Sequence, residues 1–261
     1  KAFRNEVTPR NFTFRSREFE QMELEFFVPP AESAQWYEYW CNARLQWYID
    51  LGIPADMLML RPHDADELSH YSSGTSDIEF KYPWGWGELE GVAQRTNYDL
   101  TQHANHSGQK LDYFDQSTNE RYIPYVIEPA AGVNRAMAAF LLAAYDEDEV
   151  GGESRTILRL HPRLAPYKLA VLPLSKKDTL TPLARDIFRS LSERYMVDYD
   201  DTQSIGKRYR RQDEVGTPLC VTVDFDSLDD RAVTIRDRDT TEQVRVPIES
   251  LLTEVSGRLG F

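Results

Sequence analysis

Two charged residues near the start of the chain, Arg4 and Glu6, stand two positions apart, and Phe19, Gln21 and Glu23 follow at the same spacing. Side chains two positions apart share one face of a β-strand, so a hairpin between the two segments would gather all five on one surface. A guanidinium can bind phosphate and carboxylate oxygens, an aromatic ring can stack on a base, and carboxylates can hold an amine or ammonium group. Such a surface would suit a nucleotide beside a small cation, although an exposed strand face with ion pairs gives the same pattern.

A second candidate is the segment "YVIEPAAGVNRAMAAFLL". We expect a strand through Glu128, a turn containing Gly132 and a helix with Arg135 in its first turn. An arginine near a helix N-terminus is well placed to bind phosphate. Taken alone, however, a glycine and an arginine at this spacing are a weak signal.

The first part of the chain reads as strands with helices between them, which predicts an α+β fold with a mostly antiparallel sheet. A stripe of tryptophans, Trp36, Trp40 and Trp47, has helical spacing and is expected to pack in the core. The expected strands are 3–7, 16–28, 77–82, 88–94 and 121–128, and the expected helices are 32–51 and 131–145.

The second part alternates strands and helices more regularly, beginning with a strand at 168–172 and a helix at 181–195. This pattern predicts an α/β domain. We place the domain boundary near Arg163, which gives domains 1–163 and 164–261. The acidic segment 146–154 reads as a loop.

The net charge of −13 makes the chain a poor non-specific binder of nucleic acid, because phosphate contacts dominate that affinity. A role with nucleic acid would have to rest on a local basic cluster. Lys207, Arg208, Arg210 and Arg211 form the one candidate, and from charge alone a solvated helix face is the more common explanation.

Cys41 and Cys220 are far apart in the sequence, and no pattern of cysteines and histidines typical of a zinc site is present. His103 and His106 could share a helical face but have no third ligand at a recognisable spacing, so we expect surface residues. No apolar run is long enough to span a membrane. A reducing, cytoplasmic setting without membrane contact is the interpretation that fits best.

Together these segments resemble the signature motifs of class II aminoacyl-tRNA synthetases. The stretch "FRNE…FRSREFEQMELEFF" is similar to the second motif of the dimeric glycyl-tRNA synthetases, and the similarity extends through "WGELEGVAQRTNYDL" to "IGKRYRRQDEVGTPLCVTVD". The resemblance implies a class II antiparallel catalytic domain over 1–163 and an α/β anticodon-binding domain over 164–261. It also implies that glycine and ATP form glycyl-adenylate and that the glycyl group passes to the 3′ end of tRNA(Gly).

The resemblance further implies residue roles. Arg4 and Arg135 would act in catalysis on the phosphates, and Glu88 would hold Mg²⁺ through ATP. The implied ATP-binding residues are Arg4, Asn5, Glu6, Phe14, Arg15, Phe19, Glu88, Leu89, Gly132 and Arg135. The implied glycine-binding residues are Phe19, Gln21, Glu23, Arg95, Glu128 and Gly132. Within the anticodon-binding domain, the cluster Lys207, Arg208, Arg210 and Arg211 becomes the expected tRNA-binding surface.

The chain departs from the family pattern in two places near the expected site. Ala130 stands where many members have serine, and Asn134 lies in the variable turn of the third motif. The chain also begins at the second motif, without the first motif that forms the family's homodimer interface, so we expect the isolated segment to be inactive or poorly soluble.

Two other interpretations stay open at this point. The chain could be a synthetase-like protein without catalysis, of the kind that serves a polymerase as an accessory subunit, or a structural piece with an incomplete sheet. Arg4, Glu6, Phe19, Glu88 and Arg135 are all present, which favours the enzyme.

Overall fold

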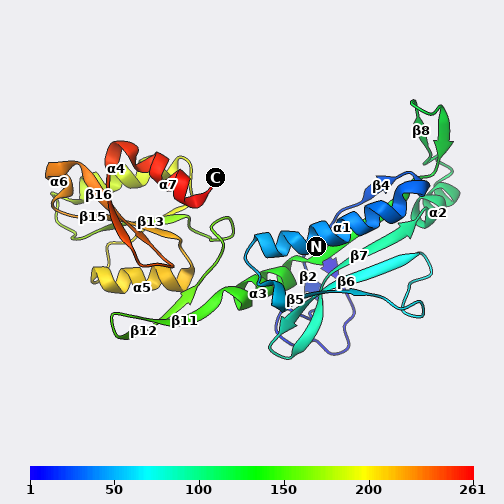
Figure 1. The fold of residues 1–261 in the computed structure, drawn as a ribbon, viewed down its shortest axis with the longest axis horizontal. Coiled ribbons are helices and arrows are strands. Elements are labelled where there is room, and N and C mark those ends of the chain that lie inside the picture. The colour runs from blue at the N-terminus through cyan, green and yellow to red at the C-terminus, as the bar shows by residue number, and fades with distance from the viewer. The chain divides into compact units, whose positions relative to one another are not determined.

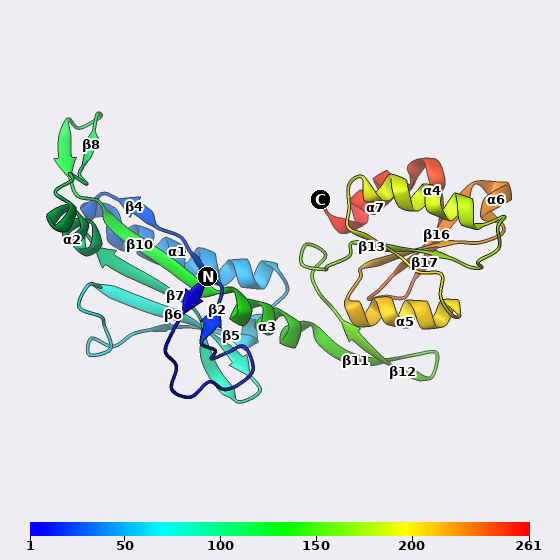
Figure 2. The same cartoon turned by 180° about the vertical axis from the view of Figure 1, so that it is seen from behind.

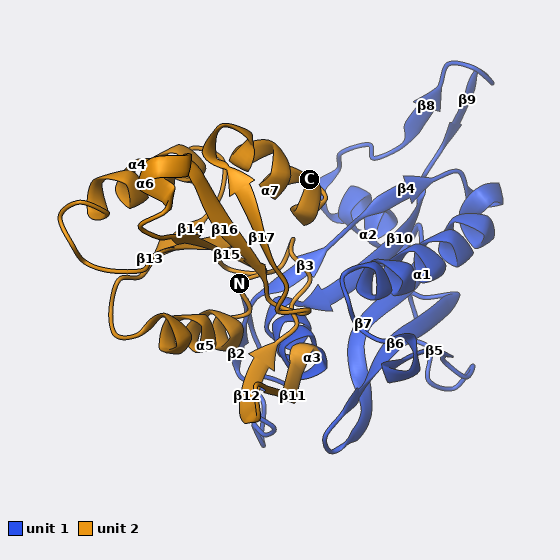
Figure 3. Ribbon diagram, turned by 60° about the vertical axis from the view of Figure 1, so that its left-hand side comes forward, with its two compact units in different colours: residues 1–143 blue, residues 144–261 orange.

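The computed structural model describes residues 1–261. The chain forms two compact units, Lys1–Ala143 and Ala144–Phe261, coloured separately in Figure 3. Each unit has its own sheet and its own core, as expected for a two-domain chain.

The first unit is built on one antiparallel sheet with strand order β3-β10-β7-β6-β5, and β4 also pairs with β10 (Figures 1 and 3). This architecture confirms the expected α+β class. The strands are β3 (Gln21–Glu23), β4 (Phe26–Val28), β5 (Leu58–Pro62), β6 (Gly74–Tyr82), β7 (Gly85–Thr96) and β10 (Tyr125–Gly132).

Helix α1 (Ser33–Asp50) packs against one face of this sheet. Trp36 and Trp40 contact a buried cluster that contains Val92 and Ile127 from the two central strands, and Phe26 packs against both tryptophan rings. Trp47 packs edge-on against Phe140. The tryptophans are partly buried and pack against the core, so the stripe faces the sheet as its spacing predicted but does not lie fully inside the core.

A buried ion pair lies under the same face. Glu90 of β7 is 1% exposed and accepts from Arg44 Nε at 2.6 Å, Arg44 Nη2 at 3.0 Å and the Tyr48 hydroxyl at 2.8 Å. Burial and the neighbouring carboxylate raise the pKa of Tyr48 far above its usual range. Glu90 thus joins α1 to the sheet, and the opposite face of the sheet is left for function.

The N-terminal segment differs from its expected form. Only β1 (Ala2–Phe3) and β2 (Glu18–Phe19) pair, so the strand expected over 3–7 ends at Phe3 and the one over 16–28 is broken into three pieces. A backbone hydrogen bond from Glu6 N to Arg4 O at 2.9 Å closes a tight turn at this point. Arg4 and Glu6 therefore do not share a strand face, and that part of the sequence prediction was wrong.

The remaining elements of the first unit connect these strands. The strand expected over 121–128 is divided, because Ile123 and Pro124 separate a small hairpin from β10. A helix follows β10 as expected. These elements are α2 (Tyr98–Ser107), β8 (Tyr113–Asp115), β9 (Glu120–Tyr122) and α3 (Val133–Ala144).

The second unit has a five-stranded sheet in the order β14-β13-β15-β16-β17 (Figure 2). β13 pairs in parallel with both neighbours, and the other pairs are antiparallel. Helices α4 and α7 pack on one face and α5 on the other, which confirms the α/β prediction. The elements are β13 (Leu169–Pro173), α4 (Thr181–Ser192), β14 (Val197–Tyr199), α5 (Ile205–Val215), β15 (Leu219–Val223), α6 (Ser227–Asp230), β16 (Ala232–Asp237), β17 (Gln243–Pro247) and α7 (Leu251–Leu259).

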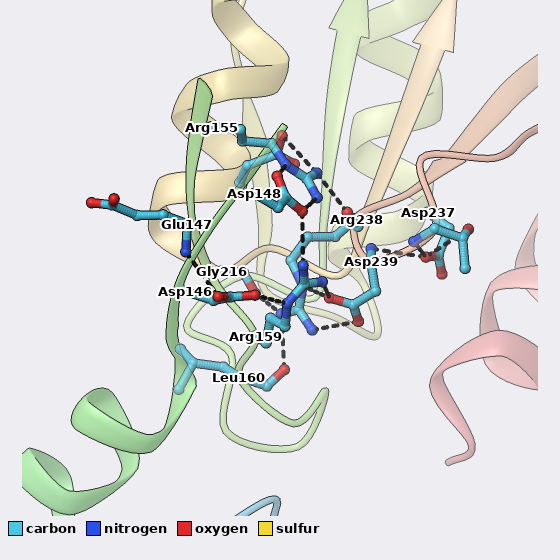
Figure 4. A network of polar contacts seen from close by, with 12 residues as sticks. Asp146, Glu147, Asp148, Arg155, Arg159, Leu160, Gly216, Asp237, Arg238 and Asp239 are labelled. Atoms are coloured by element: carbon cyan, nitrogen blue, oxygen red, sulfur yellow. Dashed lines mark hydrogen bonds and ion pairs between the residues drawn. The ribbon is translucent and has the colours of Figure 1, made fainter. Parts of the chain in front are cut away.

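The acidic segment expected to be a loop is instead a hairpin of β11 (Tyr145–Val150) and β12 (Glu153–Leu158). Gly151 and Gly152 form its turn at φ values of 64° and 82°, which favour glycine. The acidic residues form a strand because alternate ones, Asp146 and Asp148, face arginines of the partner strand and its continuation, Arg155 and Arg159 (Figure 4).

Arg155 fixes the hairpin to the body of the second unit. Its side chain is 1% exposed and donates to Asp148 Oδ1 at 2.7 Å, Asp213 Oδ2 at 3.3 Å and the Arg238 carbonyl at 2.8 Å. Arg236 binds both oxygens of Asp213, and Arg238 donates to the carbonyls of Leu160 and Gly216. The compact unit therefore begins at Ala144, upstream of the boundary expected near Arg163.

No helix of the chain is both long and apolar enough to cross a membrane.

Candidate functional site

A pocket lies in the first unit where β3, β7 and β10 meet the N-terminal segment. We call it the arginine pocket, because Arg4, Arg15 and Arg135 all line it. Every residue predicted to bind ATP lines it except Asn5 and Leu89. Its other lining residues are Glu6, Thr13, Phe14, Ser16, Phe19, Gln21, Glu88, Ala130, Gly132 and Asn134.

Arg4 and Phe19 form one side of the pocket. The β1–β2 pair brings them together: Ala2 lies opposite Phe19, and Arg4 N donates to Arg17 O at 2.9 Å. The Arg4 guanidinium carbon lies 5.2 Å from the centre of the Phe19 ring. A cation and an aromatic face are therefore placed together, as the spacing predicted, although a turn and not a shared strand face positions Arg4.

Glu6 and Arg15 are joined across the loop between β1 and β2. Arg15 Nη1 lies 3.2 Å from Glu6 Oε2, and Arg15 also pairs with Arg10 through two backbone hydrogen bonds. Arg15 Nε is buried and has no hydrogen-bond partner in the protein. A buried donor without a partner is costly, so this nitrogen is a candidate to bind a ligand.

Arg135 closes the opposite side from the first turn of α3. Its Nε donates to the Phe14 carbonyl at 2.9 Å, its Nη1 donates to the Glu88 carbonyl at 3.1 Å, and its guanidinium carbon lies 4.3 Å from the centre of the Phe14 ring. Nη1 also lies 3.3 Å from Glu88 Oε2. Arg135 thus ties β7 to the N-terminal loop while one face of the guanidinium lines the pocket.

Asn134 connects the turn before Arg135 to the N-terminal segment. Its side-chain oxygen accepts from Glu20 N at 2.8 Å, and its carbonyl accepts from Thr13 Oγ1 at 3.3 Å. Val133 N also donates to Glu20 O at 2.9 Å. The turn that precedes Arg135 is therefore anchored to the N-terminal segment, which fixes the position of that arginine.

Two of the predicted ATP residues lie outside the pocket. Leu89 is 1% exposed, since it points into the core of the sheet, so its side chain cannot contact a ligand. Asn5 is exposed but does not line the cavity. Asn5 and Leu89 are the sequence neighbours of Glu6 and Glu88, which do line the pocket. The motif alone does not separate a lining residue from its neighbour.

The predicted glycine residues divide between two pockets. Phe19, Gln21 and Gly132 line the arginine pocket. Arg95 and Glu128 line a second one, the glutamate pocket, where Arg95 Nη1 donates to Glu128 Oε1 at 2.9 Å. The residues of the glutamate pocket are Glu25, Phe27, Arg95, Asp99, Leu100, His103, Val126 and Glu128.

Arg95 is held firmly in the glutamate pocket. Its Nε and Nη2 donate to Asp99 at 2.7 and 3.1 Å, and its guanidinium carbon lies 4.3 Å from the centre of the Tyr71 ring. Glu23 lines neither pocket and is exposed; its backbone lies opposite Ala130 in the sheet. The resemblance implied that Glu23 and Glu128 both bind glycine, and the register places Glu23 two residue pairs away from the position opposite Glu128.

Glu25 is a pocket residue that the sequence analysis assigned no role. Desolvation, a hydrogen bond with Glu128 and the charge of Glu128 together raise the pKa of Glu25 to about 7. The alternation of residues 21–25 was a usable signal, but Glu25 lies in the break between β3 and β4, where a strand pattern no longer fixes direction.

The strand register places small residues between acidic ones on the face opposite α1. Asp77 lies opposite Gly91, Gly91 opposite Ala130, and Ala130 opposite Glu23. A Cβ atom on Gly91 would lie 3.6 Å from Asp77 Oδ1. The centre of this face therefore carries only small side chains, Gly91 and Ala130, between Asp77 and Glu23.

The basic cluster of the second unit does not form one surface. Arg208 is 2% exposed and donates to the carbonyls of Pro173, Asp200 and Gln203, so its predicted role in tRNA binding was wrong. Arg211 donates from Nε to Asp200 Oδ2 at 2.9 Å and is half-buried.

Only two members of the cluster, Lys207 and Arg210, line a third pocket, between α5, the β11–β12 hairpin and the β16–β17 turn. Arg210 lies 3.7 Å from Glu153 there, and Lys207 is exposed. The charge run in the sequence marked a helix, and helical periodicity divided its members between the core and the surface.

The chain is similar to known proteins over its whole length. It is 59% identical to a glycine–tRNA ligase of Corynebacterium glutamicum, with 99% of this chain and 58% of the relative covered. Glycine–tRNA ligases of Bacillus cereus and Geobacillus thermodenitrificans are 58% and 57% identical, with all of this chain and 57% and 56% of the relatives covered. The chain thus spans somewhat more than half the length of these curated relatives.

Two further comparisons concern the domains. Residues 168–258 match the family model described as an anticodon binding domain. The crystal structure of a prolyl-tRNA synthetase from Cryptosporidium parvum, complexed with L-proline and AMP, superposes with a TM-score of 0.71 at 17% identity, covering 99% of this chain and 54% of that one. The fold is therefore that of class II aminoacyl-tRNA synthetases, and by sequence the chain belongs to the glycine–tRNA ligase family.

Proposed function

We propose that the chain is the part of a glycine–tRNA ligase that activates glycine with ATP and binds the anticodon region of tRNA(Gly). The observation that carries the proposal is the arginine pocket, in which three arginines, an aromatic ring and a carboxylate from distant parts of the sequence line one cavity. A synthetase-like protein without catalysis would have no need to keep this set together.

The nucleotide would be held by the cations and the ring. Phe19 would stack on the adenine, Glu6 would accept from its amino group, and Arg4 and Arg135 would bind the α- and γ-phosphates. Arg15 would reach the same phosphates, and its unpaired Nε supports this role. The half-exposed Glu88 carboxylate could bind Mg²⁺ together with ATP. The ion would neutralise phosphate charge.

The reaction needs no side-chain nucleophile. A glycine carboxylate oxygen attacks the α-phosphorus, pyrophosphate leaves, and glycyl-adenylate forms; the terminal ribose hydroxyl of the tRNA then takes the glycyl group and AMP leaves. The role of the protein is to position the reactants and to place positive charge where negative charge develops. Arg4 lines the pocket beside Phe19, and this position supports such a role.

Glycine would lie over the small residues Gly91 and Ala130, with its ammonium group toward Glu23 and Glu128. A substrate without a side chain is best selected by filling the space that a Cβ would occupy, since overlap excludes larger amino acids more strongly than a pocket favours one extra methylene, which is worth about 1–3 kcal/mol. Gln21 and Gly132 at the end of β3 and β10 would complete this boundary.

In the second unit, Lys207 and Arg210 would contact tRNA phosphates, and the pocket they line would face the anticodon region. We also propose that the complete protein acts in the cytoplasm as a homodimer. These proposals rest on the relationship to glycine–tRNA ligases and on the match to an anticodon-binding domain.

The test is glycine-dependent exchange of pyrophosphate into ATP by the full-length protein, with Arg4→Ala as the variant. We expect exchange with glycine in the wild type and a loss of at least about a hundredfold in the variant, since the removed charge meets the transferring phosphate. Exchange that does not depend on glycine, or near-normal exchange by Arg4→Ala, would overturn the proposal.

A further inference from the structure

Glu25 has no role in the proposed reaction, yet it lies at the edge of the glycine site. The regular strand is interrupted between β3 and β4, at Leu24 and Glu25. The residues on either side of Glu25 nevertheless pair with β10. Leu24 N donates to Pro129 O at 3.0 Å, and Phe26 lies opposite Ile127. The backbone therefore holds Glu25 directly across from Glu128, and both carboxyl groups line the glutamate pocket.

Two carboxylates in hydrogen-bonding distance cannot both be ionised without strong repulsion, because neither has a proton to donate. Arg95 donates to Glu128 Oε1, and its other hydrogen bonds go to Asp99, so the positive charge of the pocket lies on the Glu128 side of the pair. The proton of the pair therefore belongs mainly to Glu25. Desolvation and the Glu128 contact raise the pKa of Glu25 to about 7, and Arg95 opposes that rise.

The other charged groups near the pair are few. Glu23 lies on the same segment and also favours a protonated Glu25. On α2, Asp99 is bound by Arg95, and the exposed His103 lines the same pocket. Histidine is the side chain whose charge most often changes near neutral pH, so any test must separate the contribution of His103 from that of the carboxyl pair.

We propose that Glu25 is a positioning residue for the amino acid: it shares a proton with Glu128 and releases that proton when the ammonium group of glycine binds. The inference rests on the proposed function, since it takes glycine as the ligand. A cation beside the pair stabilises the state in which both groups are ionised, so ligand binding and proton release are linked.

The linkage fixes the direction of the pH dependence. Because the bound ammonium group favours deprotonated Glu25, glycine binds more tightly as the pH rises through the range in which Glu25 titrates. Below that range, binding must first expel the proton. The KM for glycine should therefore fall about fivefold between about pH 6 and pH 8, while kcat and the KM for ATP change less than about twofold.

The direct test is calorimetry of glycine binding to the full-length enzyme near neutral pH, in two buffers with different heats of ionisation. The difference between the two measured heats reports the protons released. We expect proton release from the wild type and none from Glu25→Gln, in which an amide donor of the same shape takes the place of the protonated carboxyl group. The KM for glycine of this variant should stay near the wild-type value at low pH and should no longer change with pH.

His103→Gln is the matched control, because it removes the imidazole of the pocket and leaves the carboxyl pair in place. It should retain both the proton release and the pH-dependent KM. Wild-type enzyme that binds glycine without releasing a proton, or a Glu25→Gln variant that still releases one, would overturn the role of Glu25. A wild-type enzyme with no glycine-dependent reaction at all would instead overturn the proposed function. The wild-type measurement alone remains decisive if the variant does not fold.

Discussion

The role of Arg135 depends on partners that lie far from it in the sequence. Its guanidinium donates from Nε to the Phe14 carbonyl and from Nη1 to the Glu88 carbonyl. Only the rest of the guanidinium group is left to contact a ligand. A glycine and an arginine at the right spacing indicated a phosphate-binding turn. They could not indicate that the same arginine also joins the N-terminal loop to β7.

At the residue scale we therefore predict that Arg135→Ala raises the KM for ATP by roughly 10- to 100-fold, the equivalent of one charged hydrogen bond of about 1.5–3 kcal/mol. Steady-state kinetics of pyrophosphate exchange would measure it. Arg189→Ala is a matched control, since Arg189 is exposed, lies in the second unit and contacts only Asp186 and the Arg185 carbonyl of its own helix. An unchanged KM for ATP in Arg135→Ala would remove Arg135 from the nucleotide site.

A second residue-scale prediction concerns Ala130, which lines the arginine pocket opposite Glu23. Ala130→Ser adds one hydroxyl group to the floor of the proposed glycine site. We expect the KM for glycine to fall by about threefold, as one hydrogen bond of about 0.5–1.5 kcal/mol would give, with the KM for ATP unchanged. A change in the KM for ATP alone would place Ala130 beside the nucleotide instead.

At the element scale, the β11–β12 hairpin depends on a buried arginine. Arg155→Ala leaves Asp213 with only Arg236 and removes the support of the hairpin, so we expect the free energy of unfolding of the second unit to fall by about 3 kcal/mol or more. The midpoint of thermal unfolding should fall by more than about 10 °C. In Arg189→Ala, which breaks an exposed pair, the change should be below about 1 kcal/mol. Equal effects of the two variants would mean that the buried network adds no stability.

The same element predicts a pH dependence. A hydrogen bond from Arg155 lowers the pKa of Asp148, and one from Arg159 lowers the pKa of Asp146, both below the ordinary value of 3.8. A group with a lowered pKa in the folded state contributes stability that is present above its unfolded pKa and is lost as the pH falls through the folded value. Urea unfolding should therefore show a constant stability contribution above about pH 5 and a loss below about pH 4. The double variant Asp146→Asn, Asp148→Asn should be less sensitive to acid over that window, and equal sensitivity would contradict the assignment.

The elements also show what the sequence could predict. Periodicity identified α1, α3 and the strands β6, β7, β10 and β13, because burial on one face repeats with the period of each element. It did not identify the edge strands β5 and β14. It did not predict the β11–β12 hairpin, since alternating acidic residues look like a solvated loop unless Arg155 and Arg159 are known to face them. It also failed for residues 3–7, where the turn at Arg4 depends on a single backbone hydrogen bond.

The candidate site was predictable where residues lie in one short segment and less so where they come together through the fold. The motif around Arg4 and Phe19 was found from spacing and family resemblance. The division of the glycine residues between two pockets depends on how β3 and β4 pair with β10, which no local pattern contains. Arg208 was misplaced for a similar reason, since charge says nothing about which side of α5 is covered.

At the scale of the whole molecule, the two units should separate at a defined point. We predict that residues 144–261 form a stable fragment and that residues 164–261 form a much weaker one, because the shorter fragment lacks Arg155 and leaves part of the Asp213 and Arg238 network without partners. Circular dichroism and thermal unfolding of the two fragments would compare them. Fragments of equal stability would show that the hairpin is an appendage and not part of the unit.

The partners of Arg155 also set an order of events on the ribosome. The hairpin is the first piece of the second unit to leave the exit tunnel, whereas Asp213 and Arg238 follow it by 58 and 83 residues. During that interval the guanidinium has no buried partner and must stay hydrated, so the nascent hairpin remains open to proteases and chaperones. Translation pauses between these positions would lengthen that exposure. Helix α5 and the residue after β16 thus decide when β11 and β12 become protected.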